Sequence, residues 1–186
     1  MTLKEIIANR RAVYPDQYID KPIDKADLLE ILEAGNWAPT HKKTEPWRFK
    51  VIQGGSLNLL SDFLAETYEK ITPTDKFSAF KKKKIALKPK QSGAVIAICM
   101  QRDLKESLPE WEEVASVAMA VQNMWLMASS LGLGAYWSSP GLISEMHKFF
   151  ELKEGEKCLG FLYLGNYTGD LPQGKRGDIE SKITWI

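Results

Sequence analysis

The sequence is poor in the two residue types that most often bind metals or form disulfides, with two cysteines and two histidines among 186 residues. Cys99 and Cys158 each lie inside an apolar run, and no CxxC or Cys/His ligand spacing is present. This pattern argues against a structural zinc site and predicts two buried, reduced thiols. Residues 1–5 contain no apolar signal-peptide core, so we expect a cytoplasmic protein, in which thiols stay reduced.

An excess of charge of one sign is also missing, because 25 basic residues stand against 24 acidic ones and the formal net charge is +1. Overall charge therefore does not favour nucleic acid or an anionic membrane as a partner, although a local basic site remains open. No apolar run approaches the ~20 residues that cross a bilayer. Apolar residues make up 44% of the chain, and we expect one globular domain over residues 1–186.

The common signatures of nucleotide-binding and hydrolytic enzymes are absent as well, since there is no GxGxxG, no P-loop and no GxSxG. A Ser-His-Asp triad would have to use His41, and nothing in the sequence specifies its serine. His147 lies beside Phe149 and Phe150 on an expected helix, where a surface or packing role is the better interpretation. These patterns identify no catalytic side chain.

Helices and strands alternate along the chain without the repeated βαβ unit of about 30 residues and its glycine-rich turn. Helices are predicted at residues 3–11, 24–35, 56–71, 110–131 and 144–150, and their expected N-caps are Thr2 with Glu5, Asp24, Ser56 and Ser144. Alternating or continuous apolar runs predict strands at residues 47–52, 93–100, 135–137 and 157–165. The expected fold is α+β, with helices around a small mixed β-sheet.

Residues 72–91 are the least regular part of the sequence, and they contain the run Lys81–Lys84. A run of like charges is usually a solvated surface, so we expect a mobile excursion here. A nucleic-acid site is disfavoured by the neutral total and by the lack of an accompanying aromatic ladder.

The helix expected at residues 110–131 is apolar nearly all round between residues 114 and 128. This stretch is too short to span a membrane, so protein must bury it on most sides. The covering surface is either a second copy of the chain or the rest of its own subunit.

Two places have the character of binding sites. Arg10 and Arg11 fall where the first helix ends, and paired guanidiniums there either bind a phosphate or simply form a solvated helix C-terminus. The second place is the loop at residues 36–47, in which Pro39 and Pro46 bracket polar and cationic side chains between a helix and a strand. Rigid loops of this kind are where binding groups gather.

These features occur in an order that resembles the nitroreductase family of FMN flavoproteins. The residues that carry the resemblance are Arg10-Arg11-Ala12, Ala34-Gly35 with Ala38-Pro39, Glu45-Pro46-Trp47-Arg48-Phe49, Gly132, Gly134-Ala135 with Trp137, and Gly160–Gly165. His41-Lys42, which follows the Ala-Pro pair, is similar to the short, minimal branch of the family. The resemblance covers essentially the whole chain.

The resemblance implies a nitroreductase-like α+β domain that forms a homodimer with two FMN sites at the subunit interface. It places the FMN phosphate and ribityl chain against Arg10, Arg11 and Ala12. It implies that Trp37 and His41 reach the flavin from the neighbouring subunit. Trp137, Ser138 and Ser139 would run along the isoalloxazine ring, and Arg176 or its neighbour Lys175 would supply a second phosphate contact.

The implied activity is two-electron transfer from NADPH or NADH, by way of FMN, to nitroaromatic compounds, quinones or similar flat electrophiles. Two other interpretations remain open: a flavin-binding carrier or sensor with little turnover, and an interaction protein that uses Lys81–Lys84. The chain also departs from the family pattern at five positions. These are Ala12 for serine, Trp37 for arginine, Glu45 for glutamine, and Ser138 with Pro140 in place of an Arg-Ser-Gly pattern.

Overall fold

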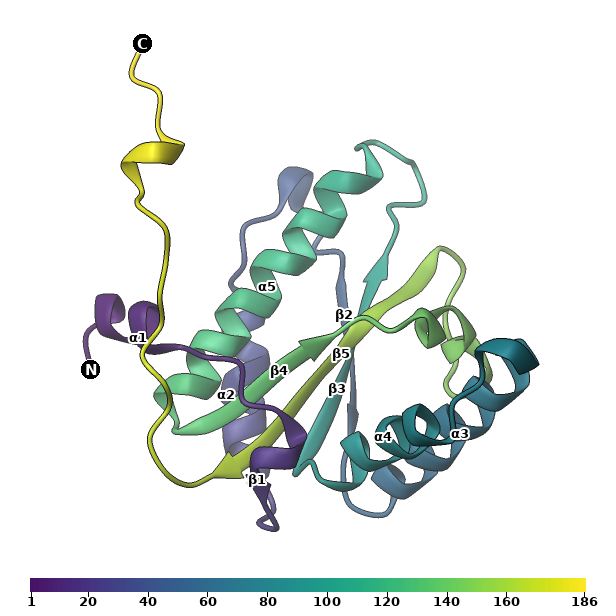
Figure 1. The fold of residues 1–186 in the computed structure, drawn as a ribbon. Coiled ribbons are helices and arrows are strands. Elements are labelled where there is room, and N and C mark those ends of the chain that lie inside the picture. The colour runs from purple at the N-terminus through teal and green to yellow at the C-terminus, as the bar shows by residue number, and fades with distance from the viewer.

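The computed structural model describes residues 1–186 and contains an antiparallel β-sheet with helices on both of its faces (Figure 1). The α-helices are α1 (Leu3–Asn9), α2 (Lys25–Asn36), α3 (Ser56–Ile71), α4 (Ala79–Lys90) and α5 (Glu110–Ser130). The strands are β1 (Tyr18–Ile19), β2 (Trp47–Ile52), β3 (Ala94–Gln101), β4 (Leu133–Ser138) and β5 (Glu156–Tyr167). Five short 3₁₀ helices complete the structure: η1 (Pro15–Gln17), η2 (His41–Lys43), η3 (Thr74–Lys76), η4 (Gly141–Lys148) and η5 (Glu180–Lys182).

The sheet is organised around β5, which pairs with β3, β4 and β1, while β2 pairs with β3. All four strand pairings are antiparallel. The parallel component of the expected mixed sheet is limited to a single bridge between Ala12 and Ala135. This bridge holds the segment that follows α1 against β4.

The continuous apolar run at residues 93–100 forms β3, and it is buried along almost its whole length, as its sequence predicts. Successive side chains of a strand point to opposite faces, so β3 supplies two separate cores. Its even-numbered residues from Ala94 to Met100 pack with α2 and α5, and Val95, Ala97 and Cys99 pack with α3 and η4. Cys99 and Cys158 are both free and buried, as predicted, and they lie opposite one another in the β3–β5 pairing.

The helix starts agree only in part with the predicted caps. Thr2 and Glu5 form the predicted capping box. Asp24 occupies the N-cap of α2 without a side-chain hydrogen bond, and Gly55 rather than Ser56 caps α3. Residues 141–148 form the 3₁₀ helix η4 instead of an α-helix, and the Ser144 hydroxyl donates back to the carbonyl of Gly141.

The prediction that residues 72–91 are irregular is wrong, because most of this segment forms η3 and α4. Ser78 caps α4 by accepting a hydrogen bond from the backbone N–H of Lys81. The helix packs against α3, where the Ser61 hydroxyl donates to the carbonyl of Ala86 over 2.6 Å. Lysine is a good helix former, and tertiary contacts supply the remaining stabilisation.

The C-terminal segment runs away from the body of the protein after β5 and ends in an extended arm (Figure 1). Ile179, Ile183 and Trp185 of this arm are exposed. No helix combines the length and the apolar character that a membrane span needs.

Candidate functional site

Arg10 lies where the first helix ends. It is the C-cap of α1, with a ψ of 127° that turns the chain out of the helix. Its half-buried side chain extends over α5, where the guanidinium carbon lies 4.5 Å from the ring centroid of Trp125. This is a cation–π contact, and it fixes the position of the charge while leaving the guanidinium edge open.

Arg11 has a different environment, because its guanidinium is held by backbone carbonyls. Nη1 donates to Ala8 and Arg10, and Nε donates to Pro172 of the C-terminal segment over 2.9 Å. Gly174 passes so close that a Cβ there would lie 2.3 Å from the Arg11 guanidinium. Arg11 therefore ties the C-terminal segment to the end of α1.

A third guanidinium, that of Arg176, completes a cluster of positive charge. Burial, followed by the charges of Arg176 and then Arg11, lowers the pKa of Arg10 below its ordinary value. None of the ion pairs in the molecule involves these three arginines. Like charges held together without a carboxylate partner form a site for an anion. Arg176, rather than Lys175, is the residue of the C-terminal segment whose charge lowers the pKa of Arg10.

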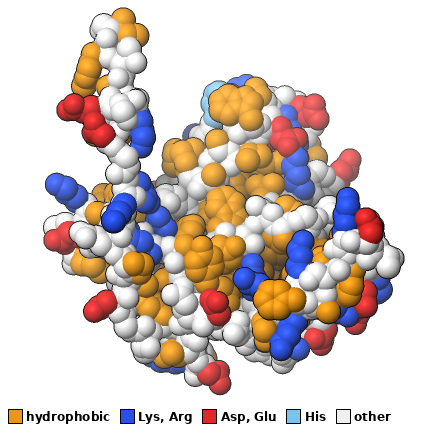
Figure 2. Space-filling view, in the orientation of Figure 1, with side chains coloured by type: hydrophobic (Ala, Val, Ile, Leu, Met, Phe, Trp, Pro, Cys, Tyr) orange, Lys and Arg blue, Asp and Glu red, His pale blue; other side chains and the backbone are white.

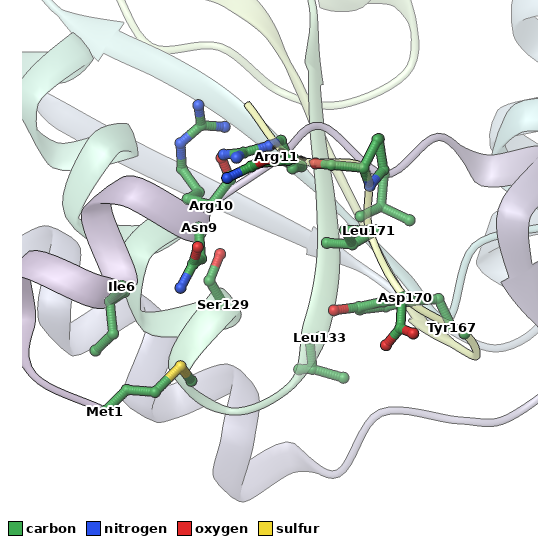
Figure 3. Close-up of a pocket in the computed structure, with 14 residues that line it drawn as sticks. Met1, Ile6, Asn9, Arg10, Arg11, Ser129, Leu133, Tyr167, Asp170 and Leu171 are labelled. Carbon is green, nitrogen blue, oxygen red and sulfur yellow. Dashed lines mark hydrogen bonds between the residues drawn. The ribbon is translucent and has the colours of Figure 1, made fainter. Parts of the chain in front are cut away.

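A cavity of about 460 Å³ opens beside this cluster. Figure 3 shows Arg10 and Arg11 next to one another at one end, with the apolar side chains of Met1 and Ile6 further along the wall. The side chain of Arg10 rises away from these apolar residues, and Asp170 lies at a distance from both arginines (Figure 3). The basic end of the cavity is thus separate from its acidic residue.

Trp37 and His41 lie in the loop that joins the end of α2 to the start of β2. Trp37 is 79% exposed. His41 lies in η2, and its Nδ1 is 2.6 Å from Oε2 of Glu112 near the start of α5. Neither side chain is buried, so both remain available to another surface.

The arginines and this loop contact opposite ends of α5. Arg10 packs on Trp125 and His41 pairs with Glu112, which lies 13 residues earlier on the same helix. At 1.5 Å per residue these two contacts are about 20 Å apart along the axis. One chain alone therefore does not bring His41 to Arg10, whereas an antiparallel partner helix would place one chain's loop beside the other chain's arginines.

The third group of predicted residues lies at the end of β4. The backbone N–H of Val13 donates to the carbonyl of Ala135 over 3.1 Å, which places Ala12 beside this strand. Trp137 and Ser138 end β4, and Ser139 follows them. Trp137 packs toward α2 and α5, and its buried Nε1 has no hydrogen-bond partner. Trp137 and Ser138 therefore present their side chains to opposite faces of the sheet.

Two aromatic residues of this region, Tyr14 and Tyr136, were not predicted from the sequence. Their ring centroids are 4.6 Å apart. Tyr136 points to the same face of the sheet as Ser138, because it lies two residues earlier on β4. The sequence signal that could have identified Tyr136 is the alternation of side chains along a strand. This alternation places Tyr136, rather than Trp137, on the same face of the sheet as Ser138.

Comparison with known proteins gives consistent matches over nearly the whole chain. A family model described as "Nitroreductase family" matches residues 7–166. The chain is 31% identical over 168 residues to an Escherichia coli K12 protein named "Putative NAD(P)H nitroreductase YdjA", covering 89% of this chain and 88% of that protein.

Solved structures have the same fold. A nitroreductase-like family protein from Bacillus cereus superposes with a TM-score of 0.86 at 27% identity, covering 100% of this chain and 96% of the other. A nitroreductase with bound FMN from Bacteroides fragilis gives a TM-score of 0.76 at 23% identity, covering 100% and 99% of the two chains. The likeness thus includes the end of α1, the loop before β2 and the end of β4.

Proposed function

Because this chain belongs to the nitroreductase family, we propose that it is an FMN-dependent oxidoreductase that uses NAD(P)H to reduce nitroaromatic compounds, quinones or similar flat electrophiles. The observation that carries this proposal is the cluster of Arg10, Arg11 and Arg176, which has no carboxylate partner. A phosphate dianion is the anion that such a cluster of guanidiniums suits best.

The residues present fit FMN at both of its ends. Arg10 and Arg176 would hold the phosphate, and Arg11 keeps the tail that carries Arg176 in place. Ala12 lacks a side-chain hydroxyl, so its contribution would be limited to the backbone. Ser138 and Ser139 would lie along the ring system from the end of β4.

The chemistry that FMN supplies when bound is transfer of two electrons from NAD(P)H to an acceptor. A nitro group that receives them takes up two protons and loses one oxygen as water, giving a nitroso group, while NAD(P)H is oxidised to NAD(P)⁺. A quinone takes up the same two electrons and two protons and becomes a hydroquinone. The chain's own contribution is to bind and orient, and we assign no side chain as general acid or base.

We also propose that the working unit is a homodimer with an FMN site at each end of its interface. The arginines and the Trp37–His41 loop contact opposite ends of α5, and a twofold axis would bring them together. Trp111 and Met119 on α5 are 69% and 40% exposed, and Trp185 of the C-terminal arm is 89% exposed. Large apolar side chains left uncovered in one chain are typical of an interface.

The direct test is whether the purified protein carries FMN and whether NAD(P)H bleaches that flavin in a stopped-flow experiment. We expect a yellow protein whose flavin absorbance falls on mixing with NAD(P)H and returns when a quinone is added. A protein that purifies without flavin and binds none from solution would contradict the proposal. Bound flavin that stays oxidised with both NADH and NADPH would instead indicate a flavin carrier or sensor.

A further inference from the structure

The lysines of α4 fall into two groups. Lys82 and Lys90 pair with carboxylates of α3, with Lys82 Nζ 2.5 Å from Glu69 and Lys90 Nζ 3.1 Å from Asp62. Lys81, Lys83, Lys84 and Lys88 form no ion pair. Of these four, Lys84 and Lys88 lie four residues apart on one face of the helix, where like charges repel each other. The structure therefore neutralises one group of lysines and leaves the other without a counter-charge.

The unpaired lysines stand between two grooves. One groove, of about 580 Å³, lies between α4 and the segment at residues 14–16, and Tyr136 forms part of its wall. The other, of about 590 Å³, lies between α4 and residues 140–142. Lys84 and Lys88 line both grooves, and Asp16 is the one acidic residue in either lining. Basic and apolar side chains alternate over the α4 region on the face seen in Figure 2.

Aromatic rings form the wall opposite these charges. Lys88 Nζ lies 5.1 Å from the ring centroid of Tyr136 and 6.0 Å from that of Tyr163. Tyr14 packs against Tyr136. The site thus combines flat apolar surfaces, against which a ring can pack, with ammonium groups that would pair with a negative substituent.

The grooves also adjoin the segment proposed to contact the flavin ring. Tyr136 lies two residues before Ser138 on β4, and Pro140 directly follows Ser139. A molecule bound between α4 and these residues would lie next to the proposed electron-transfer site. This places the unpaired lysines where an electron acceptor would bind.

Resting on the proposed function, we propose that Lys84 and Lys88 make this enzyme selective for anionic aromatic acceptors, of which aromatic carboxylates are the simplest class. The ring would pack against Tyr14 or Tyr136, and the carboxylate would pair with the ammonium groups. An uncharged acceptor of the same shape would keep the ring contact and lose the charge contact.

The test compares para-nitrobenzoate with para-nitrobenzamide, which have nearly the same shape and differ in charge. In the holoenzyme we expect the KM for the benzoate to be about tenfold lower than that for the benzamide, because one additional charge-assisted contact changes affinity by about that factor. The double substitution Lys84→Gln with Lys88→Gln should raise the KM for the benzoate about tenfold and leave that for the benzamide unchanged. Lys84→Arg with Lys88→Arg should retain the preference.

The matched control is Lys82→Gln with Lys90→Gln, which removes the same charge from the opposite face of the same helix. Equal KM values for the two acceptors in the wild type would overturn the inference. An equal rise in the KM for the benzoate in the two Lys→Gln variants would overturn it too. Calorimetric titration of para-nitrobenzoate without NAD(P)H provides a readout that does not depend on turnover. If neither acceptor is reduced, the proposed function fails, and the titration still decides whether the lysine groove binds anionic rings.

Discussion

Arg10 and Arg11 are neighbours in sequence with different roles in the structure. Arg11 has its guanidinium bonded to carbonyls at Ala8, Arg10 and Pro172, whereas Arg10 only stacks on Trp125. Three of the five N–H donors of Arg11 are already used, so its guanidinium has fewer left to offer a phosphate than that of Arg10. Arg10 is therefore the direct phosphate ligand in our interpretation, and Arg11 positions the tail.

This difference predicts separate effects for the two arginines. Arg10→Ala should weaken FMN binding by about ten- to a hundredfold, since a charge-assisted contact is lost. Arg10→Lys should retain part of that affinity, because it keeps the charge and loses the planar fork. Equilibrium dialysis with FMN measures both variants, and Lys4→Ala on the exposed surface of α1 is the control. An Arg10→Ala protein that binds FMN as tightly as the wild type would contradict the phosphate assignment.

Arg11→Ala should act through the C-terminal segment. We expect faster amide hydrogen exchange at residues 172–176, because the contact to the Pro172 carbonyl is lost. FMN affinity should fall less than in Arg10→Ala. Unchanged exchange in this segment would show that Arg11 does not position it.

Glu156 gives a pH prediction that is independent of the cofactor. Burial opposes ionisation of its carboxyl, but Lys50, 2.8 Å away, and the backbone N–H of Lys153 lower its pKa below the ordinary value. A carboxyl with a lowered pKa in the folded state stabilises the protein above its unfolded pKa of about 4.3. This stabilisation disappears as the pH falls through the folded-state pKa.

Glu156→Gln should therefore lower the free energy of unfolding by about 1.5–3 kcal/mol at pH 7. The difference from the wild type should shrink as the pH falls below the lowered pKa of this carboxyl, because the wild-type side chain is then protonated too. Urea denaturation across a series of acidic pH values, at one fixed protein and FMN concentration, measures this difference. Glu151→Gln, at an exposed glutamate without an ion pair, is the control, and a pH-independent difference would rule out the charge mechanism.

At the scale of elements, strongly patterned segments were predictable and weakly patterned ones were not. The apolar run of β3 and the long apolar pattern of α5 give the correct elements within one or two residues of their ends. α4 has only a weak apolar pattern, because lysine occupies six of its 12 positions. Its stability comes from contacts with α3, such as Ser61 to Ala86, which no local pattern reveals.

The same distinction applies to the site residues, because some could be predicted from the sequence and others could not. The order of motifs brought out Arg10, His41 and Ser138, because each lies at the end of a recognisable element. Lys84 is one of four consecutive lysines, and nothing in the local sequence distinguishes Lys88 from the nearby Lys90. Only the packing of α4 on α3 separates the paired lysines from the unpaired ones.

The cap of α4 is testable at this scale. Ser78→Ala removes the side chain that accepts from the Lys81 N–H and should destabilise the helix by about 1 kcal/mol. Ser78→Asp should keep the cap and also place a negative charge at the helix N-terminus. Amide hydrogen exchange of residues 79–90 should be faster in Ser78→Ala and not in Ser78→Asp. Equal exchange in both variants would show that tertiary contacts alone hold α4.

At the scale of the whole molecule, α5 determines both the core and the proposed interface. Its inner side packs on the sheet and α2, while its outer side keeps Trp111 and Met119 exposed with half-buried Ala115 and Ala118 between them. The sequence showed an apolar helix without showing which side its own subunit would cover. The structure shows that one side is left uncovered, and the two parts of the candidate site contact its two ends.

A charge on the uncovered side of α5 should therefore separate the subunits and release the cofactor together. Met119→Glu places a carboxylate on that side, where a second chain would have to bury it without a partner. We expect the wild type to elute at twice the mass of one 21.0 kDa chain and the variant to elute as a single chain. FMN affinity should fall in parallel, because Trp37 and His41 of the partner would no longer reach the site. Leu59→Glu, at an exposed leucine of α3, is the matched control and should leave both properties unchanged. A Met119→Glu protein that becomes monomeric and still binds FMN with wild-type affinity would show that each chain contains a complete site.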